Sequence, residues 1–176
     1  MRSRTVRSLI GTVVLIALLA SVLLDKSGSD GGRSPADPPA SARSADALVT
    51  RVVDGDTVEV SIGGRTDDVR YIGIDTPETV KPGTPVQCFG PQASDRNHAL
   101  VEGRRVRLVF DRERRDVYGR LLAYVYADGV FVNAALVRGG YARTLTIPPN
   151  TAHAGLFHRL ARSAGRDGRG LWAVCS

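Results

Sequence analysis

Two short acidic clusters occur where the chain is expected to turn. Asp54 and Asp56 belong to the sequence VVDGDTVEV, and Asp75 and Glu78 belong to YIGIDTPE. Carboxylate and main-chain carbonyl oxygens at one edge of a sheet are suitable ligands for a hard cation such as Ca²⁺ or Mg²⁺, whereas zinc prefers clusters of His and Cys. The alternative is a purely structural role, because Asp, Gly and Thr are also common turn formers.

The segments around these clusters are predicted to be strands. Five short stretches of apolar or alternating residues are separated by turn signals. They are ALVTRVV, TVEVSI, DVRYIGID, RRVRLVF and LLAYVYADG, the last running on into VFVN. This pattern is typical of a small barrel or sandwich, in which the acidic turns would gather at one rim of the sheet.

Three helices are predicted between and after the strands. PQASDRNHALVEG begins after Gly90 and ends at Gly103, VNAALVRGG ends at a double glycine, and TAHAGLFHRLARSAG follows the segment TLTIPPN. In the last of these helices the apolar residues fall on one face, as expected for a helix that packs against a sheet.

The N-terminal part of the chain is predicted to lie outside the domain. Arginines precede an uncharged apolar run at residues 8–24, an order that fits both a cleaved signal peptide and an uncleaved signal anchor. We assign residues 1–24 to a signal anchor or signal peptide, 25–46 to a disordered linker rich in Ser, Gly, Asp and Pro, and 47–176 to one domain. The domain is expected to be extracytoplasmic, either secreted or anchored to a membrane by its N-terminal helix.

Cysteine usage and charge agree with an exported protein that meets a polyanion. We expect a disulfide between Cys88 and Cys175, because an even number of cysteines in a small exported domain favours a bridge over free thiols. The chain has 24 basic and 18 acidic residues and a net charge of +6 at pH 7, which favours nucleic acid or an acidic membrane surface as its partner. No oligomerisation signal is visible in the sequence, and we expect a monomer.

The order and spacing of these motifs resemble those of the staphylococcal nuclease (thermonuclease) family. The resemblance rests on VVDGDTVEV, VRYIGIDTPET, CFGPQAS and RRDVYGRLLAYVYADGVFVNAALVRGGYA, and it extends from about Ala47 to Trp172. It implies a β-rich α+β fold, a five-stranded OB-fold barrel with about three helices. It also implies a calcium-dependent endonuclease that hydrolyses phosphodiester bonds of DNA and RNA with little sequence preference and leaves 3′-phosphate products.

The resemblance further implies a role for each acidic residue. Asp56, Asp75 and the main-chain carbonyl of Thr76 correspond to the ligands of one Ca²⁺ ion, and Asp54 corresponds to an acid that helps to order the water on that ion. Glu78 corresponds to the proposed general base, which takes a proton from the attacking water. Such proton transfer is typically worth ~10² to 10⁴ in rate.

Two arginines and a tyrosine complete the implied site. Arg70 and Arg120 correspond to the residues that bind the phosphate, which suits the planar, multiply donating guanidinium group because negative charge builds on the phosphate oxygens during attack. Tyr118, in the sequence DVYGR, is expected to contact the sugar or phosphate of the substrate. Recognition through the backbone favours flexible or single-stranded DNA and RNA.

The sequence also departs from the family pattern at three positions near the implied substrate site. Val117 stands where well-known members carry a lysine, and Leu145 and Ile147 stand where they carry tyrosines. These changes affect the expected binding of the base and of the product end, not the hydrolytic groups. The alternative function is a catalytically inactive OB-fold module that binds nucleic acid, but such modules usually lose an acid or an arginine, and Arg70 and Arg120 are present here with Glu78.

Overall fold

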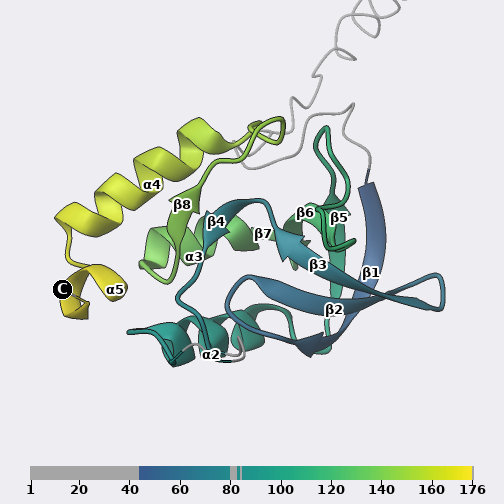
Figure 1. Cartoon of the computed structure of the whole chain (residues 1–176), viewed down its shortest axis with the longest axis horizontal. Coiled ribbons are helices and arrows are strands. Elements are labelled where there is room, and N and C mark those ends of the chain that lie inside the picture. The colour runs from purple at the N-terminus through teal and green to yellow at the C-terminus, as the bar shows by residue number, and fades with distance from the viewer. Residues whose placement is uncertain (1–43, 80–82, 84, 176) are drawn as a thin grey trace, which may run out of the picture. The chain divides into compact units, whose positions relative to one another are not determined.

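The computed structural model describes residues 44–79, 83 and 85–175, which fold into a closed β-barrel with helices on its outer surface (Figure 1). Five strands form the barrel: β1 (Ser44–Val52), β2 (Thr57–Ile62), β3 (Arg65–Tyr71), β5 (Arg105–Val109) and β6 (Leu121–Ala127). They are hydrogen-bonded in the order β3-β2-β1-β5-β6, and the parallel pairing of β3 with β6 closes the ring. The short strand β7 (Val130–Phe131) adds to the sheet beside β6. The predicted five-stranded OB-fold barrel is therefore confirmed.

The interior of the barrel is filled by alternate residues of its strands. Val58 and Val60 of β2 are fully buried, whereas Glu59 between them is partly accessible. Likewise Val106 and Leu108 of β5 are buried between exposed arginines, as the alternation in the sequence predicted. Period-two alternation places one set of side chains in the core, so the strands need no further apolar residues on their outer faces.

Helices cover the outside of the barrel. The three longer helices, α2 (Gly90–Val101), α3 (Val132–Gly139) and α4 (Ala154–Arg166), confirm the predicted ones, and a one-turn helix α5 (Leu171–Val174) follows them. Figure 1 shows α2 beneath the barrel, apart from α4, which lies on the other side of the small β4–β8 sheet. The helix α4 buries Phe157 and Ala164 from its predicted apolar face.

The segment DVRYIGID, predicted as one strand, is divided in two. After β3 the chain turns at Ile72 and Gly73, and residues Gly73–Asp75 form β4, which pairs antiparallel with β8 (Arg143–Leu145). Gly73 has φ +81°, and a Cβ atom there would lie 2.5 Å from the ring of Phe157. Glycine thus permits both the turn and the close approach of α4, and the turn takes Asp75 out of the barrel sheet.

The N-terminal predictions fall mostly outside the described part of the chain. Residues 1–43, which include the predicted signal anchor or signal peptide and most of the linker, lie outside the described residues. Strand β1 begins at Ser44, ahead of the predicted domain start at Ala47, so the last linker residues are ordered by pairing with β5. Within the described ranges, every helix is too short or too polar to cross a membrane.

Cys88 and Cys175 form a disulfide bond. The bond joins the segment that precedes α2 to the residue that follows α5, and its partners are separated by 87 positions in the sequence. Closing a loop of that length contributes about 4 to 5 kcal/mol to the free energy of unfolding in the chain-entropy model. The disulfide thereby holds the C-terminal turn to the N-terminus of α2.

Candidate active site

Arg70, near the end of β3, is the centre of the charged site at the barrel rim. Its guanidinium makes ion pairs with Asp56 (Nη1 to Oδ1, 3.0 Å) and Asp75 (Nη2 to Oδ1, 2.8 Å). Nη1 also donates hydrogen bonds to the main-chain carbonyls of Ile74 (3.0 Å) and Tyr71 (3.3 Å). Because one guanidinium holds both carboxylates, residues that lie far apart in the sequence converge on the same point.

Asp56 is a buried carboxylate with only 3% of its surface exposed. Its Oδ2 accepts hydrogen bonds from the main-chain N–H (2.7 Å) and the hydroxyl (2.9 Å) of Thr76. Burial raises the pKa of Asp56 to about 7, with a further contribution from the nearby Asp54, while Arg70 and the bonds from Thr76 act in the opposite direction. The ionised Asp56 carboxylate is therefore energetically unfavourable at this position, and an additional cation would stabilise it.

The turn that carries Asp56 is attached to α2 by a buried asparagine. The side-chain amide of Asn97 donates to the main-chain carbonyl of Asp54 (2.8 Å), and its Oδ1 accepts from the hydroxyl of Tyr71 (3.0 Å). Within the turn, Asp54 Oδ1 accepts from the main-chain N–H of Asp56 (3.0 Å). Asn97 is completely buried, so these bonds are protected from competition with water.

Sequence reasoning missed Asn97, although a signal was available. Asn97 lies four residues after Ala93 and four before Val101, and all three are buried on the inner face of α2. A polar side chain on the apolar stripe of a helix must find partners in the interior, because an unpaired buried amide is costly. Its position therefore indicates a specific hydrogen-bonded contact with the barrel.

The predicted ligand set fits a small hard cation. The carboxylates of Asp56 and Asp75 already converge on one cationic group, and the buried Asp56 carboxylate lacks sufficient compensation for its charge. The set contains only two carboxylates, with a main-chain oxygen of Thr76 as the third ligand, and no group of three His, Cys, Asp or Glu side chains forms a metal site in the described part of the chain. A set with so few charged ligands would bind Ca²⁺ weakly.

Arg120 is presented by a tight turn in the sequence DVYGR. Asp116 Oδ1 accepts from the main-chain N–H groups of Tyr118 and Arg120, both at 3.0 Å, and Asp116 Oδ2 accepts from Arg120 Nε at 2.7 Å. Gly119 has φ +85°, which the turn requires. Tyr118 is 82% exposed, and the Arg120 guanidinium lies over its ring at 5.5 Å from the centroid. Both side chains are thus available to a ligand at the surface.

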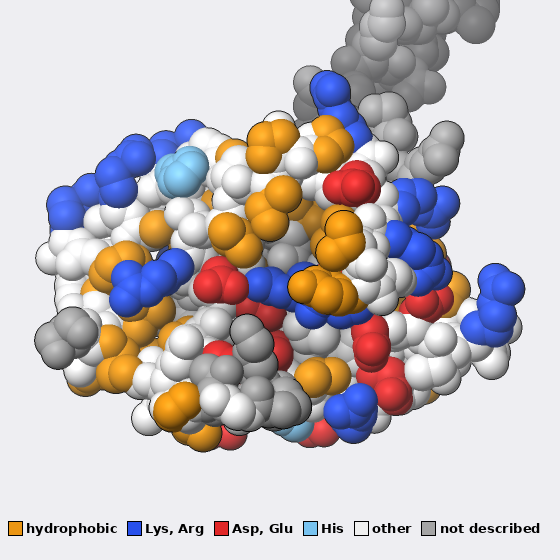
Figure 2. Space-filling view, in the orientation of Figure 1, with side chains coloured by type: hydrophobic (Ala, Val, Ile, Leu, Met, Phe, Trp, Pro, Cys, Tyr) orange, Lys and Arg blue, Asp and Glu red, His pale blue; other side chains and the backbone are white. Residues whose placement is uncertain are grey.

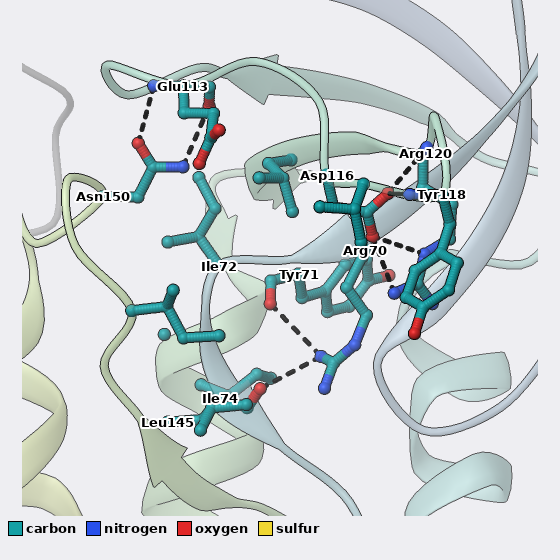
Figure 3. A pocket seen from close by; sticks show the side chains of 14 residues that line it. Arg70, Tyr71, Ile72, Ile74, Glu113, Asp116, Tyr118, Arg120, Leu145 and Asn150 are labelled. Carbon is teal, nitrogen blue, oxygen red and sulfur yellow. Dashed lines mark hydrogen bonds and ion pairs between the residues drawn. The ribbon is translucent and has the colours of Figure 1, made fainter.

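Arg70 and Arg120 line one cavity of about 330 Å³ (Figure 3). In Figure 3, Arg70, Asp116, Tyr118 and Arg120 lie on one side of the cavity, and the other side carries Ile72, Leu145, Glu113 and Asn150. The aliphatic part includes Ile72, Leu145 and Ile147. The full lining is Arg70, Tyr71, Ile72, Gly73, Ile74, Glu113, Asp116, Val117, Tyr118, Arg120, Leu122, Leu145, Ile147 and Asn150. The structure therefore places Arg70, Arg120 and Tyr118 around one cavity.

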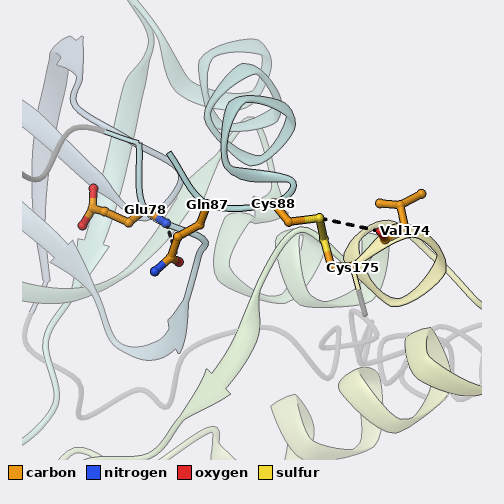
Figure 4. Close-up of a disulfide and its surroundings, with 5 residues drawn as sticks. All are labelled: Glu78, Gln87, Cys88, Val174 and Cys175. Carbon is orange, nitrogen blue, oxygen red and sulfur yellow. Dashed lines mark hydrogen bonds between the residues drawn. A yellow bond between two sulfur atoms is a disulfide. The ribbon is translucent and has the colours of Figure 1, made fainter. Parts of the chain in front are cut away.

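Glu78 does not line this cavity and lies on the segment that follows β4. Its main-chain N–H donates to Gln87 Oε1 and its main-chain carbonyl accepts from the N–H of Gln87, both at 2.9 Å (Figure 4). Its carboxylate accepts a hydrogen bond from the main-chain N–H of Thr79 (2.9 Å). The position of Glu78 is thus set by the segment before α2 and not by a strand of the barrel.

The cavity also contains residues that the sequence did not identify. Ile72 and Leu122 are aliphatic residues in strand-like segments, and nothing in the pattern distinguishes them from core residues. Asn150 exchanges two hydrogen bonds with the main chain of Glu113, at 2.8 and 2.9 Å, and this pair holds the loop before β6 against the loop after β8. Such a contact between distant loops depends on the tertiary structure.

The accessible face shows the same combination of side chains. In Figure 2, acidic side chains gather near the middle of the face, basic side chains lie next to them, and hydrophobic side chains lie above. The exposed hydrophobic residues around the cavity include Val117, Leu145 and Ile147. A ligand with both anionic and apolar parts would match this surface.

Fold and site together define an OB-fold barrel protein with an acidic and arginine-containing site at the barrel rim. The chain belongs to the staphylococcal nuclease homologue family, whose model matches residues 68–174. This membership supports a nuclease, a hydrolase whose substrates are nucleic acids.

Curated relatives agree with the family assignment. The chain is 39% identical over 163 residues to the thermonuclease of Staphylococcus intermedius, covering 93% of this chain and 97% of the relative. It is 45% identical over 130 residues to the SPbeta prophage-derived endonuclease YokF of Bacillus subtilis, covering 73% of this chain and 44% of the relative. For endonuclease YncB of the same organism the identity is 45% over 125 residues, covering 70% of this chain and 59% of the relative. The chain thus spans nearly all of the first relative and about half of the two endonucleases.

Proposed function

We propose that this protein is a calcium-dependent endonuclease that hydrolyses phosphodiester bonds of DNA and RNA with little sequence preference. The observation that carries the proposal is the convergence of Asp56 and Asp75 on Arg70, in the wall of a cavity that Arg120 also lines. A phosphodiester placed there would meet guanidinium donors and, through a bound cation, the two carboxylates. We infer that the 3′-phosphate remains on one product and a 5′-hydroxyl on the other.

Arg70 and Arg120 bind the phosphate oxygens. Each guanidinium has five N–H donors, so an ion pair with a carboxylate leaves donors for a phosphate. The pairs with Asp75 and Asp116 hold the planes of the two groups before the substrate arrives, which reduces the entropy lost on binding. The donors become most effective as charge develops on the equatorial oxygens in the transition state.

Glu78 takes a proton from the water that attacks phosphorus. A new P–O bond forms to the water oxygen, the bond from phosphorus to the 5′ oxygen breaks, and that oxygen leaves as a hydroxyl after taking up a proton from solvent water. Asp56, Asp75 and the carbonyl of Thr76 would hold the Ca²⁺ ion. The ion supplies a positive charge that offsets the negative charge on the phosphate and on the buried Asp56.

The cavity lining supports the proposal of weak sequence preference. Beyond the two arginines, six of the twelve lining residues are aliphatic, and side chains such as Leu145 and Ile147 cannot read the hydrogen-bonding edge of a base. Tyr118, at the mouth of the cavity, offers an exposed aromatic ring that can contact a sugar or base. Recognition therefore rests on the phosphate and favours a single-stranded or flexible substrate.

The disulfide supports action in an oxidising, extracytoplasmic compartment. Disulfides persist outside the cytosol, where Ca²⁺ is also abundant enough to fill a weak site. Activity would then depend on export, with residues 1–24 as the signal peptide or membrane anchor. We further propose that the protein acts as a monomer, since the site is built from one chain.

The decisive experiment is cleavage of single-stranded DNA and of RNA by the purified full chain, with millimolar Ca²⁺ or with a chelator. We expect cutting only with Ca²⁺, 3′-phosphate ends, and a drop in kcat of ~10² or more for Glu78→Gln, since general base catalysis contributes that much. Asp75→Asn should raise the Ca²⁺ concentration needed for half-maximal activity. Binding of DNA without cutting, with or without Ca²⁺, would instead support the inactive OB-fold module.

A further inference from the structure

Gln87 holds the main chain of Glu78 from both sides. Its side-chain oxygen accepts from the Glu78 N–H, and its own N–H donates to the Glu78 carbonyl, each at 2.9 Å (Figure 4). These two bonds tie the segment after β4 to the segment before α2. A two-point attachment of this kind limits rotation of the Glu78 backbone, and therefore the directions in which its carboxylate can point.

The first residue of α2 presses against the same segment. A Cβ atom on Gly90 would lie 2.8 Å from Thr79 Cγ2, 3.0 Å from the Glu78 carbonyl oxygen and 3.1 Å from the Pro77 carbonyl oxygen. Gly90 is also bonded to Gln87 through its main-chain N–H (3.0 Å). Glycine is needed here for the close approach of two backbones, so the start of α2 and the Glu78 segment form one packed unit.

The disulfide connects this unit to the C-terminal turn. Cys88 directly follows Gln87, and its partner Cys175 follows α5 (Figure 4). The helix α5 is itself fixed to the rest of the domain, because Leu171 is fully buried and its main-chain N–H donates to the carbonyl of Gly140 (2.8 Å). A contact chain therefore runs from the end of α3 through α5 and the disulfide to Gln87 and Glu78.

We propose that Gln87 is a positioning residue for Glu78 and that the Cys88–Cys175 disulfide holds Gln87 in place for this role. The inference rests on the proposed function, in which Glu78 takes the proton of the attacking water. It goes beyond that function because it makes proton transfer depend on a covalent link to the C-terminal turn. Gln87 itself does not touch the phosphate-binding arginines and acts only through the Glu78 backbone.

The alternative is that the disulfide and Gln87 contribute only to stability. The two roles differ in their kinetic effects. Loss of positioning lowers kcat and leaves KM unchanged, because Arg70 and Arg120 still bind the phosphate. A purely structural role lowers the melting temperature and leaves the kcat of the folded protein unchanged.

The first test compares Gln87→Ala, Gln87→Glu and the control Gln92→Ala in the full chain at saturating Ca²⁺, well below each melting temperature. We expect Gln87→Ala to lower kcat about 10- to 100-fold with KM unchanged, as for a small misplacement of a catalytic group. Gln87→Glu keeps an acceptor for the Glu78 N–H and should recover most of the loss. Gln92, an exposed glutamine in the first turn of α2, should tolerate alanine without effect. Unchanged kcat in folded Gln87→Ala would overturn the proposal.

The second test removes the disulfide by replacing both Cys88 and Cys175 with serine. At a temperature where circular dichroism shows the variant to be folded, kcat should fall by a similar factor, and adding Gln87→Ala should cause little further loss because both changes act on one contact chain. Full additivity, or an undiminished kcat, would contradict the proposal. Measuring Glu78→Gln in parallel separates the two hypotheses. If Glu78→Gln cuts as well as the unmodified chain, the proposed function fails. If Glu78→Gln is inactive while Gln87→Ala keeps full activity, only the positioning role of Gln87 is refuted.

Discussion

Helices α2 and α3 each carry one fully buried asparagine, but the two side chains hydrogen-bond to different parts of the domain. Asn133 of α3 accepts from the main-chain N–H of Val125 (2.9 Å) and donates to the carbonyl of Ile72 (2.9 Å), so it joins backbone segments of the core. Asn97 of α2 holds the carbonyl of Asp54 and the hydroxyl of Tyr71. The same residue type thus serves the scaffold on one side and the acidic turn on the other.

The surroundings of the two helices also differ. Beside α3, the rings of Tyr124, Phe131, His153 and Phe157 pack with centroid separations of 4.5 to 6.2 Å. On the α2 side, Asn97 donates a hydrogen bond to the turn that carries Asp56, and Gln87, just before the helix, is hydrogen-bonded to Glu78. Apolar packing tolerates small changes in the orientation of the contacting groups, whereas hydrogen bonds require a particular orientation of donor and acceptor. We therefore expect changes on the α3 side to affect mainly stability and changes on the α2 side to affect mainly catalysis.

The largest expected effect on stability is that of Phe131→Ala. Phe131 stacks on Tyr126 at 4.6 Å and contacts three other rings, so the change leaves a cavity in a closely packed region. The free energy of unfolding, measured with urea, should fall by about 3 to 5 kcal/mol. The kcat of the folded fraction should not change. A matched Phe131→Leu variant should lose less stability, and a reduced kcat in that variant would remove the distinction between the two sides.

The pair Asn97→Ala and Asn133→Ala tests the comparison directly. Each substitution leaves two buried polar groups without their partner, and each unsatisfied group costs about 1 to 3 kcal/mol. Both variants should therefore lose stability to a similar extent in urea unfolding. Only Asn97→Ala should lower kcat, by about tenfold or more, because it frees the turn that carries Asp56. Equal kcat values for the two variants would show that α2 has no special relation to the site.

The smallest expected effect is the contribution of His153 to the pH dependence of stability. Burial among aromatic rings lowers the pKa of His153 below its ordinary value of 6.5, while the charge of Asp111 acts in the opposite direction. The unfolded chain therefore binds the proton more readily than the folded one, and this contribution to stability is lost as the pH falls through and below 6.5.

The measurement is urea unfolding at several pH values between 8 and 5 for the unmodified chain, His153→Phe and the control His158→Gln. His158 is exposed on α4, near the hydroxyls of Thr144 and Thr146, and it serves as the control because it lies outside the aromatic cluster around His153. We expect the unmodified chain to lose stability relative to His153→Phe as the pH falls, and His158→Gln to follow the unmodified chain. Parallel curves for all three proteins would exclude a role for His153 in the pH dependence.

Much of the fold could be predicted from local patterns. The alternation of Val106 and Leu108 with arginines identified β5, and the glycines that end the helical segments identified the limits of α2 and α3. Strand β8 was not predicted, because three residues are too few to show an alternation and they form a strand only by pairing with β4. The division of DVRYIGID at Gly73 was missed for a similar reason, since the contact with Phe157 that requires it comes from a distant helix.

The sequence by itself determined the residue types available for chemistry, because carboxylates and guanidinium groups have their acidity and hydrogen-bonding capacity wherever they stand. It also determined the alternation of apolar and polar residues that supplies the interior of the barrel. Only the tertiary structure decided that Asp56 and Asp75 converge on Arg70. It also decided that Asn97 attaches the first acidic turn to α2 and that Gln87 makes two hydrogen bonds to the main chain of Glu78. These contacts join residues that lie 5 to 43 positions apart in the sequence, and their geometry depends on how the barrel closes and how its helices pack against it.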